Sequence, residues 1–333
     1  LAKEHYVVAG KKIVLAGSGP FTYPVANSLL KRIATETSGK KPEIVGIFEA
    51  RSQWRMVPIL LAMVLNPLKI GEALGYLRAF MRAGLTMQRR HVITAAHRNS
   101  NGELSGVTVS AIDKNYVIVP GSDRFIECDI AAISYGFTPD MTLASILGVE
   151  RKILRGEVVV HVNAVQQTSV ANVWAAGEIT GVGGHDLAMT EGLYAAMSIA
   201  RARGARTNIF MQLLVMKRRI RQRIFAAATL KVFSVPGQWL TWNDNSTIIC
   251  RCEEVTLEEI SHSFEALGAD SARTAKLFTR AGMGLCQGRV CHRNVRDVAA
   301  LFSHEKSAST TDNNRPIGAV ITLGELSDER SEH

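Results

Sequence analysis

The sequence predicts an α/β protein of several domains that ends in a small helical domain. Two segments support the α/β prediction, because each reads as an apolar strand, a group of glycines and then a helical pattern. They lie at residues 12–33 and 173–201. A third observation marks the end of the chain, where four of the five cysteines fall between residues 250 and 291. At 333 residues the chain is long enough for two or three domains.

Composition excludes several classes of protein. The chain is 47% hydrophobic and 21% charged, as globular domains are. Five cysteines in a chain of this length do not resemble a secreted disulfide scaffold. No secretory signal is visible at the start, and the longest apolar run, from Met56, is interrupted by Pro58 and too short to span a bilayer. We therefore expect a cytoplasmic protein.

The chain is basic, with a net charge of +9. Part of this charge lies in the run KRRIRQR at residues 217–223. Such a run is most often a solvated helix face. Contact with an acidic partner, or peripheral contact with the inner face of a membrane, stays open as an alternative, and nucleic-acid binding is not expected.

The first glycine turn has the features of a dinucleotide-binding loop. An apolar strand at residues 12–16 leads into Gly17 and Gly19, and a helical pattern follows Pro20. Gly17 permits a sharp turn, while Gly19 lets the backbone approach a pyrophosphate, whose charge a helix N-terminus favours. Thr22 stands where a third glycine is usual. The loop thus predicts a site for NAD(P) or another adenine nucleotide, or a retained fold whose site is empty.

The next strand ends at Glu49, whose carboxylate would accept hydrogen bonds from a ribose diol. This acid favours NAD over NADP, although Arg51 beside it blurs the choice. Glu49 comes later than the usual spacing of about 20 residues, and an extra loop at residues 36–42 accounts for the delay. A helical stretch at residues 56–88 and three short strands then complete a first domain, which we place at residues 1–127.

A second strand–turn–helix follows in the segment VWAAGEITGVGGHDLAM. Glu178, at the end of the predicted strand at residues 173–176, can bond a ribityl or ribose hydroxyl of a flavin cofactor. The helix opens near Asp186 and directs its positive end at the pyrimidine edge of a flavin, where reduction places negative charge. An ordinary turn with Asp186 as the helix N-cap is the alternative. The glycines that allow close contact are Gly177, Gly181, Gly183 and Gly184.

The motifs SYGFTPD and VWAAGEITGVGG resemble the two-dinucleotide-binding-domain flavoproteins, a Rossmann-like fold in which an NAD-type domain is inserted into a split FAD-binding domain. With VLAGSGP ahead and the cysteines behind, the chain resembles the α subunits of heteromeric amino-acid dehydrogenases, a family that includes opine oxidase, hydroxyproline and proline dehydrogenase, and hydrogen cyanide synthase. The resemblance implies that residues 128–205 are the C-terminal part of the FAD-binding domain, followed by a basic helical linker at residues 206–245. It also implies that the first FAD phosphate loop precedes residue 10, so that FAD binding needs an N-terminal segment of a longer parent protein.

The cysteine spacing, C-x-C and then C-x4-C, resembles that of bacterioferritin-associated-ferredoxin-like [2Fe–2S] domains. The resemblance implies a domain at residues 246–305 and a tail at residues 306–333. Its implied ligands are Cys250, Cys252, Cys286 and Cys291. Tetrahedral zinc, favoured by His292 beside the last cysteine, and thiols without metal stay open. A capping box of Thr256 and Glu259 predicts a helix between the two cysteine pairs.

Three basic residues lie near the cysteines in sequence, and their charge would raise the reduction potential of a cluster. They are Lys276, Arg280 and Arg289. Cys128, which stands apart from the other cysteines, is expected in the core.

These features favour the electron-transferring subunit of a heteromeric flavoprotein dehydrogenase. The resemblance implies a partner β subunit, itself a flavoprotein, that oxidises an amino acid or opine and passes electrons to a [2Fe–2S] cluster and FAD in this chain. No catalytic acid or base can be assigned here, which fits such a division of labour. The alternatives are a stand-alone NAD(P)H-dependent FAD reductase and a non-enzymatic iron–sulfur and nucleotide-binding fragment.

Overall fold

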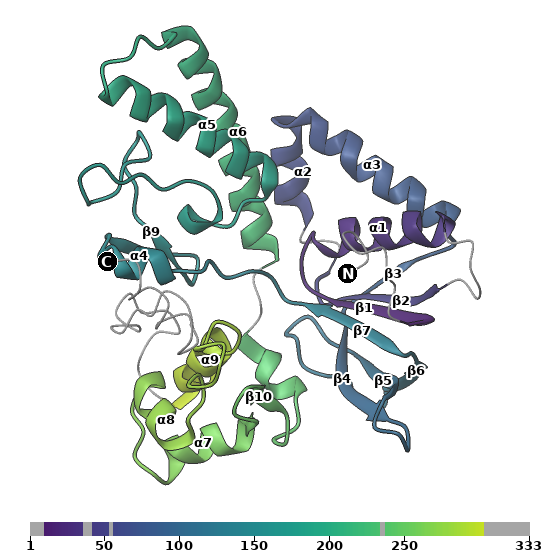
Figure 1. Cartoon of the computed structure of the whole chain (residues 1–333). Helices are drawn as coiled ribbons and strands as arrows, with labels where there is room; N and C mark the ends of the chain where they lie inside the picture. The colour runs from purple at the N-terminus through teal and green to yellow at the C-terminus, as the bar shows by residue number, and fades with distance from the viewer. Residues whose placement is uncertain (1–9, 36–41, 53–55, 234–236, 303–333) are drawn as a thin grey trace, which may run out of the picture. The chain divides into compact units, whose positions relative to one another are not determined.

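The computed structural model divides the chain into two compact units (Figure 1). Unit 1 groups Leu1–Phe137 with Lys217–Asp244, and unit 2 groups Thr138–Met216 with Asn245–His333. The residues that the structure describes are 10–35, 42–52, 56–233 and 237–302. The extra loop predicted at residues 36–42, apart from its last residue, and the predicted tail lie outside these ranges.

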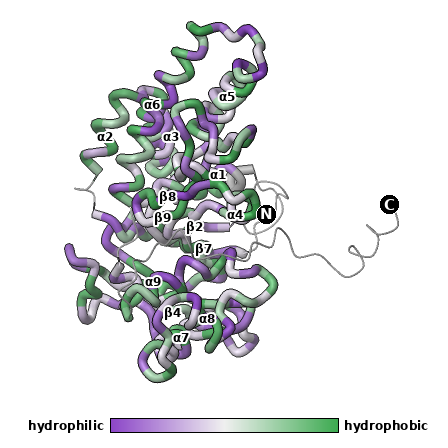
Figure 2. The backbone as a smooth tube through the Cα atoms, turned by 90° about the vertical axis from the view of Figure 1, so that its left-hand side faces the viewer, coloured by the Kyte–Doolittle hydropathy of each residue, from purple (hydrophilic) through white to green (hydrophobic). Residues whose placement is uncertain are grey.

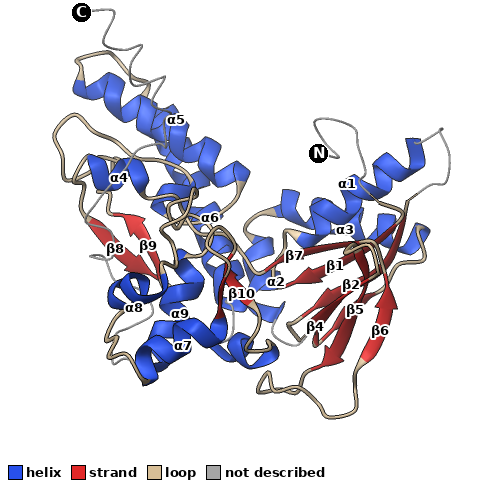
Figure 3. Ribbon diagram, turned by 60° about the horizontal axis from the view of Figure 1, so that its bottom comes forward, coloured by secondary structure: helices blue, strands red, loops and turns tan. Residues whose placement is uncertain are grey.

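Unit 1 is built on a parallel sheet with the strand order β3-β2-β1-β7. Its strands are β1 (Lys12–Gly17), β2 (Glu43–Glu49), β3 (Met87–Arg89) and β7 (Ile130–Ser134). Helices α1 (Thr22–Thr35) and α3 (Pro67–Arg82) cover one face (Figure 3). An antiparallel sheet covers the other face, with strands β4 (His91–Arg98), β5 (Leu104–Ala111) and β6 (Arg124–Glu127).

Strand β1 fills both layers of this core because successive side chains of a strand point to opposite faces. Ile13 and Leu15 pack with the helices. Val14 and Ala16 pack against β5, in the cluster that also buries Cys128. The expectation of a core cysteine is therefore confirmed, and burial raises the pKa of the Cys128 thiol.

The division of the chain differs from the predicted boundary after residue 127. Strand β7 pairs in parallel with β1 and so completes the sheet of unit 1. The crossing to unit 2 comes after Phe137. Gly17 makes this pairing possible, since a Cβ added there would lie 1.8 Å from the carbonyl oxygen of Ser134.

The linker predicted at residues 206–245 is not a separate segment in the structure, because its helix is divided between the two units. Helix α6 (Ile209–Val232) enters unit 1 at Lys217 and packs against α2 (Val57–Val64) through Ile59, Val232 and Phe233. The 3-10 helix η3 (Gly237–Trp242) follows, and the indole N–H of Trp242 donates to the carbonyl of Tyr116 at 2.7 Å.

The first part of unit 2 holds a small apolar core around Ala144, Val149 and Val160. Its elements are α4 (Thr142–Ile146), β8 (Arg151–Leu154), β9 (Glu157–Val160), η2 (Glu178–Thr180) and α5 (His185–Ala202). The strand predicted at residues 173–176 is reduced to one bridge between Gln167 and Trp174. Apolar residues of this stretch, such as Val173, still pack on the core.

The second part of unit 2 contains the four clustered cysteines and is mainly helical. It comprises β10 (Ile248–Cys250), β11 (Val255–Thr256), α7 (Leu257–Glu265), α8 (Ala272–Thr279) and α9 (His292–Phe302). The predicted capping box is confirmed: the Thr256 hydroxyl accepts from the Glu259 N–H, and the Glu259 carboxylate accepts from the Thr256 N–H at 2.8 Å. Among the described residues, no helix combines the length and apolar character needed to cross a bilayer.

The close approach at Gly17 generates a prediction. Gly17→Ala should destabilise unit 1 by more than about 3 kcal/mol, since the new methyl group would overlap backbone that cannot rotate away. Gly19→Ala is the matched control, because its φ of +137° is equally unusual but nothing lies within 4 Å of the added Cβ. It should cost about 1–2 kcal/mol. Urea unfolding of both variants checks this, and equal losses would contradict it.

Candidate metal centre and nucleotide loops

The four C-terminal cysteines come together from three short segments of unit 2. Cys250 ends β10, Cys252 lies in the turn after it, Cys286 lies in the loop after α8, and Cys291 directly precedes α9. Cys250 and Cys291 are buried, whereas Cys252 is exposed. The thiols influence one another's pKa values, Cys250 and Cys286 acting on Cys291, and Cys252 acting on Cys286, so the four side chains lie near one another. All five cysteines of the chain lie in the described residues, and none forms a disulfide.

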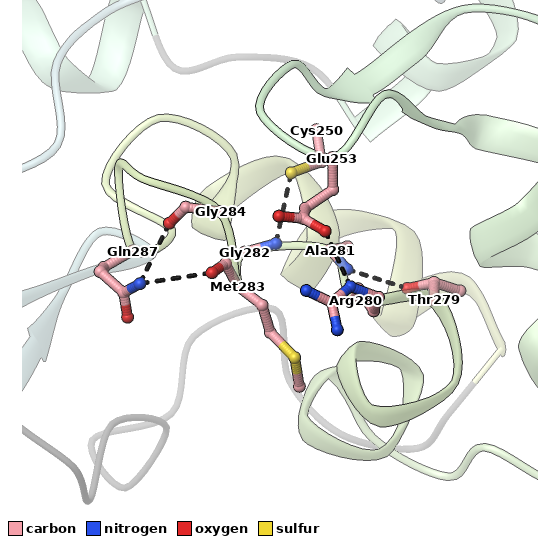
Figure 4. A network of polar contacts seen from close by, with 9 residues as sticks. All are labelled: Cys250, Glu253, Thr279, Arg280, Ala281, Gly282, Met283, Gly284 and Gln287. Atoms are coloured by element: carbon pink, nitrogen blue, oxygen red, sulfur yellow. Dashed lines mark hydrogen bonds and ion pairs between the residues drawn. The ribbon is translucent and has the colours of Figure 1, made fainter.

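Glycines let the loop after α8 lie close against the other two sulfurs. The N–H of Gly282 donates to the Cys250 sulfur at 3.3 Å (Figure 4). A Cβ added at Gly284 would lie 2.3 Å from Cβ of Cys252, so only glycine fits there. Gly282 and Gly288 adopt left-handed φ values of +81° and +79°. This geometry presents backbone N–H groups to sulfur, as iron–sulfur sites require.

The electrostatics of the four thiols differ from one sulfur to the next. Burial, together with the neighbouring Cys250 and Cys286 thiols, raises the pKa of Cys291 to about 12. Burial also opposes ionisation of Cys286, but N–H groups of Val290, Gly288 and Arg289 and the Cys252 thiol hold its pKa below the ordinary value. A positive metal centre is therefore needed for Cys291 to be a thiolate at neutral pH.

Tetrahedral zinc requires four ligands around one atom, whereas a two-iron cluster distributes four thiolates over two metal atoms. The four cysteines supply four thiols, which is the donor set that a two-iron cluster needs. When bound, such a cluster would supply one-electron redox chemistry.

Two of the three basic residues predicted to raise the reduction potential of a cluster form ion pairs with acidic residues. Nε of Arg280 lies 2.8 Å from a Glu253 oxygen. Nε of Arg289 lies 3.6 Å from an oxygen of Asp140, a residue of the predicted flavin segment. The expected effect of positive charge on the reduction potential is therefore reduced by these acids, which spacing in the sequence could not reveal.

Residues 248–300 match the family model described as the BFD-like [2Fe-2S] binding domain. This segment is a BFD-like [2Fe–2S] domain. The match agrees with the donor set and the glycines described above. The individual ligands Cys250, Cys252, Cys286 and Cys291 remain predictions.

The whole chain is similar to components of two enzymes. It is 29% identical to the hydrogen cyanide synthase subunit HcnB of Pseudomonas aeruginosa over 84% of this chain and 58% of that protein. It is 28% identical to the opine oxidase A subunit of Rhizobium meliloti over 98% of this chain and 69% of that protein. The chain thus spans less than two thirds of the HcnB proteins that it matches.

A solved structure, the L-proline dehydrogenase from P. horikoshii, matches 98% of this chain and 51% of its own with a TM-score of 0.61 and 16% identity. The similarity shows that the chain shares the fold of that protein, in agreement with the predicted α/β class. The BFD-like domain follows this fold at the C-terminal end.

The structure brings Gly19 and Glu49 together, at the carboxyl ends of β1 and β2. The Glu49 carboxylate is buried and accepts from the N–H groups of Gly19 at 3.2 Å and Arg51 at 2.9 Å. It is therefore turned toward the glycine loop rather than outward to a ribose. Gly19 itself has open space beside it, which suits a pyrophosphate. Nucleotide binding by Gly17, Gly19 and Glu49 remains a prediction.

The second loop has the same arrangement with an exposed acid. The Glu178 carboxylate accepts from the N–H groups of Gly183 at 3.3 Å and Gly184 at 2.8 Å. Gly184, and not Asp186, occupies the N-cap position of α5. The donors predicted to face a flavin are thus satisfied by Glu178 in this structure. Flavin contacts by Gly177, Glu178, Gly183 and Gly184 remain predictions.

One residue important to this loop was not predicted from the sequence. Glu191 on α5 is fully buried and accepts from the N–H of Gly177 at 3.1 Å and the hydroxyl of Thr180 at 2.8 Å. It therefore fixes the turn that presents Glu178. A glutamate among the small apolar residues of the helix was the available signal.

The [2Fe–2S] domain is attached to the predicted flavin segment by ion pairs within unit 2. Arg293 on α9 lies 2.7 Å from Glu157 on β9, and both side chains are largely buried. Burial raises the pKa of Glu157, and the charges of Arg293 and Arg296 offset part of this effect. The pair of Arg289 and Asp140 joins the cysteine loop itself to the same segment.

The cysteine geometry predicts which residues bind iron. Cys252→Ser and Cys286→Ser should each strongly lower the iron and sulfide content and bleach the visible spectrum, because a cluster needs four thiolates. Cys128→Ser is the control, since Cys128 is buried in unit 1. Iron analysis after anaerobic reconstitution measures the effect. Full iron content in both loop variants would refute the ligand assignment.

The burial of Glu49 predicts a pH dependence of stability. Burial raises its pKa from 4.5 to about 7, despite hydrogen bonds from Arg51 and Gly19. Between these values the folded protein holds a proton that the unfolded chain has released, so rising pH lowers the free energy of unfolding. Wild-type protein should therefore lose stability relative to Glu49→Gln from about pH 5 to pH 8. Urea titrations at several pH values test this, with the exposed Glu43→Gln as control; parallel curves would contradict it.

Proposed function

We propose that the chain is the electron-transferring part of a heteromeric flavoprotein dehydrogenase that acts on an amino acid or opine. The observation that supports the proposal is that the BFD-like domain and the segment predicted to bind flavin belong to one compact unit. The two are joined by the ion pairs of Arg293 with Glu157 and Arg289 with Asp140.

The roles of this chain's own residues follow from their contacts. Cys250, Cys252, Cys286 and Cys291 would hold the cluster. Glu191 orients the turn of Gly177, and Glu178 presents an exposed carboxylate that can bond a hydroxyl of FAD. A bound flavin exchanges two electrons with a substrate and a cluster exchanges one, so their pairing converts paired electrons into single ones.

The substrate class and the partner are inferred from the relatives. Both the hydrogen cyanide synthase protein HcnB and the opine oxidase A protein are subunits of larger enzymes. A partner that oxidises the substrate therefore belongs to the proposal. The described residues of this chain offer no assigned catalytic acid or base, which agrees with substrate chemistry on the partner.

A second function is favoured by one observation, the open space beside Gly19 at the end of β1. A nucleotide there would make the protein an NAD(P)H-dependent flavin reductase. Mixing the purified protein with NADH or NADPH distinguishes the two functions. Rapid flavin bleaching without a partner would favour the reductase.

The proposed electron path predicts reduction of the cluster by substrate and a dependence on the ion pair of Arg293 with Glu157. In the protein with its partner, an oxidisable amino acid or opine should reduce the cluster, detected by electron paramagnetic resonance. Arg293→Glu should slow this reduction by roughly tenfold or more, because small displacements of reacting groups are costly. The charge-swapped double variant Glu157→Arg with Arg293→Glu should restore it.

Arg273→Glu provides the matched control, since Arg273 is exposed on α8 of the same domain. Its charge change is identical but lies away from the ion pairs described above. A cluster that stays oxidised while substrate reduces flavin in the wild-type complex would overturn the proposed function.

A further inference from the structure

Helix α2 is apolar on every side, yet only one side of it is buried. Its sequence is VPILLAMV, and Ile59 and Ala62 face the interior. The opposite side exposes Leu61 at 68% and Val64 at 72%. A helix that is hydrophobic all round is normally enclosed, and contiguous exposed apolar surface marks a binding site.

Exposed aliphatic residues recur at helical spacing along α2, and one more follows at the start of α3. We use the name aliphatic face for six exposed residues, which are Val57, Leu60, Leu61, Val64, Leu65 and Leu68. Leu68, in the first turn of α3, is 86% exposed. Figure 2 shows the hydrophobic colouring along α2. The six side chains are all Val or Leu, and aromatic anchors typical of protein–protein hot spots do not occur among them.

Cationic side chains lie on the neighbouring helix α6, which packs on the buried side of α2 around Ile59. The end of α2 is fixed to α6 within unit 1, where the side-chain amide of Asn66 donates to the carbonyl of Arg221 at 3.0 Å. Lys217, Arg218 and Arg221 are exposed on α6, whose sequence contains no acidic residue. An aliphatic face with cations on a neighbouring helix is the pattern of a segment that lies in the headgroup region of an anionic bilayer.

We propose that the aliphatic face and these three cations bind the surface of an anionic phospholipid membrane. Aliphatic side chains enter the boundary between headgroups and acyl chains, while Lys217, Arg218 and Arg221 pair with lipid phosphates. The helix lies in the plane of the surface and does not cross the bilayer. The surface belongs to unit 1 and involves none of the cysteines, so binding can succeed or fail independently of electron transfer.

The test is cosedimentation of the purified protein with vesicles of phosphatidylcholine, with and without phosphatidylglycerol. Binding should require phosphatidylglycerol and weaken as salt is added, because salt screens the cations. Leu61→Asp should lower the affinity by about tenfold or more. Arg218→Gln should lower it by about fivefold. Leu143→Asp is the matched control, since Leu143 is 67% exposed on a helix of unit 2.

Circular dichroism and iron content of each variant confirm that it is folded, and Val64→Ser repeats the test with a milder change. Binding that is absent, or equal in Leu61→Asp and wild type, would overturn the proposal. Sedimentation velocity, alone and with the partner protein, distinguishes other occupants of the face. If Leu61→Asp dissociates a dimer or a partner complex but leaves vesicle binding unchanged, the aliphatic face is a protein interface instead.

Discussion

Four sulfurs held within one small domain are the constraint on which the C-terminal part of the structure depends. Cys250 and Cys291 are buried, and burial together with the neighbouring thiols raises the pKa of Cys291. A domain of this size has a small core, here centred on Ile260, Ala275 and Val298. The metal would therefore contribute to folding as well as to redox chemistry, because the same loop that binds it also sets the start of α9.

The two glycine loops share one structural feature, a glutamate carboxylate that accepts hydrogen bonds from backbone N–H groups of the loop. In each, a carboxylate from the chain accepts the backbone N–H groups that a nucleotide would use: Glu49 at Gly19, and Glu178 at Gly184. A hydroxyl group can donate a hydrogen bond to a carboxylate in this position. At the predicted sites these acids would therefore contact the sugar or ribityl part of a cofactor.

Sequence patterns specified the local features well because local chemistry decides them. The turn at Gly17, the capping box at Thr256 and the helix after Gly184 follow from backbone sterics and nearby donors. Long-range features did not follow. The pairing of β7 with β1 and the contact of Arg293 with Glu157 join residues distant in sequence, and either partner alone looks like an ordinary strand or surface charge.

The contact between the [2Fe–2S] domain and the predicted flavin segment includes charged pairs. Arg293 with Glu157 and Arg289 with Asp140 satisfy one another across it. Charged contacts of this kind give orientation more than affinity, since desolvation cancels much of their attraction. An electron carrier needs a defined orientation toward its donor and little else. The less exposed pair of Arg293 with Glu157 would therefore fix the position of the [2Fe–2S] domain on the predicted flavin segment. The more exposed pair of Arg289 with Asp140 would prevent the domain from rotating about the first pair.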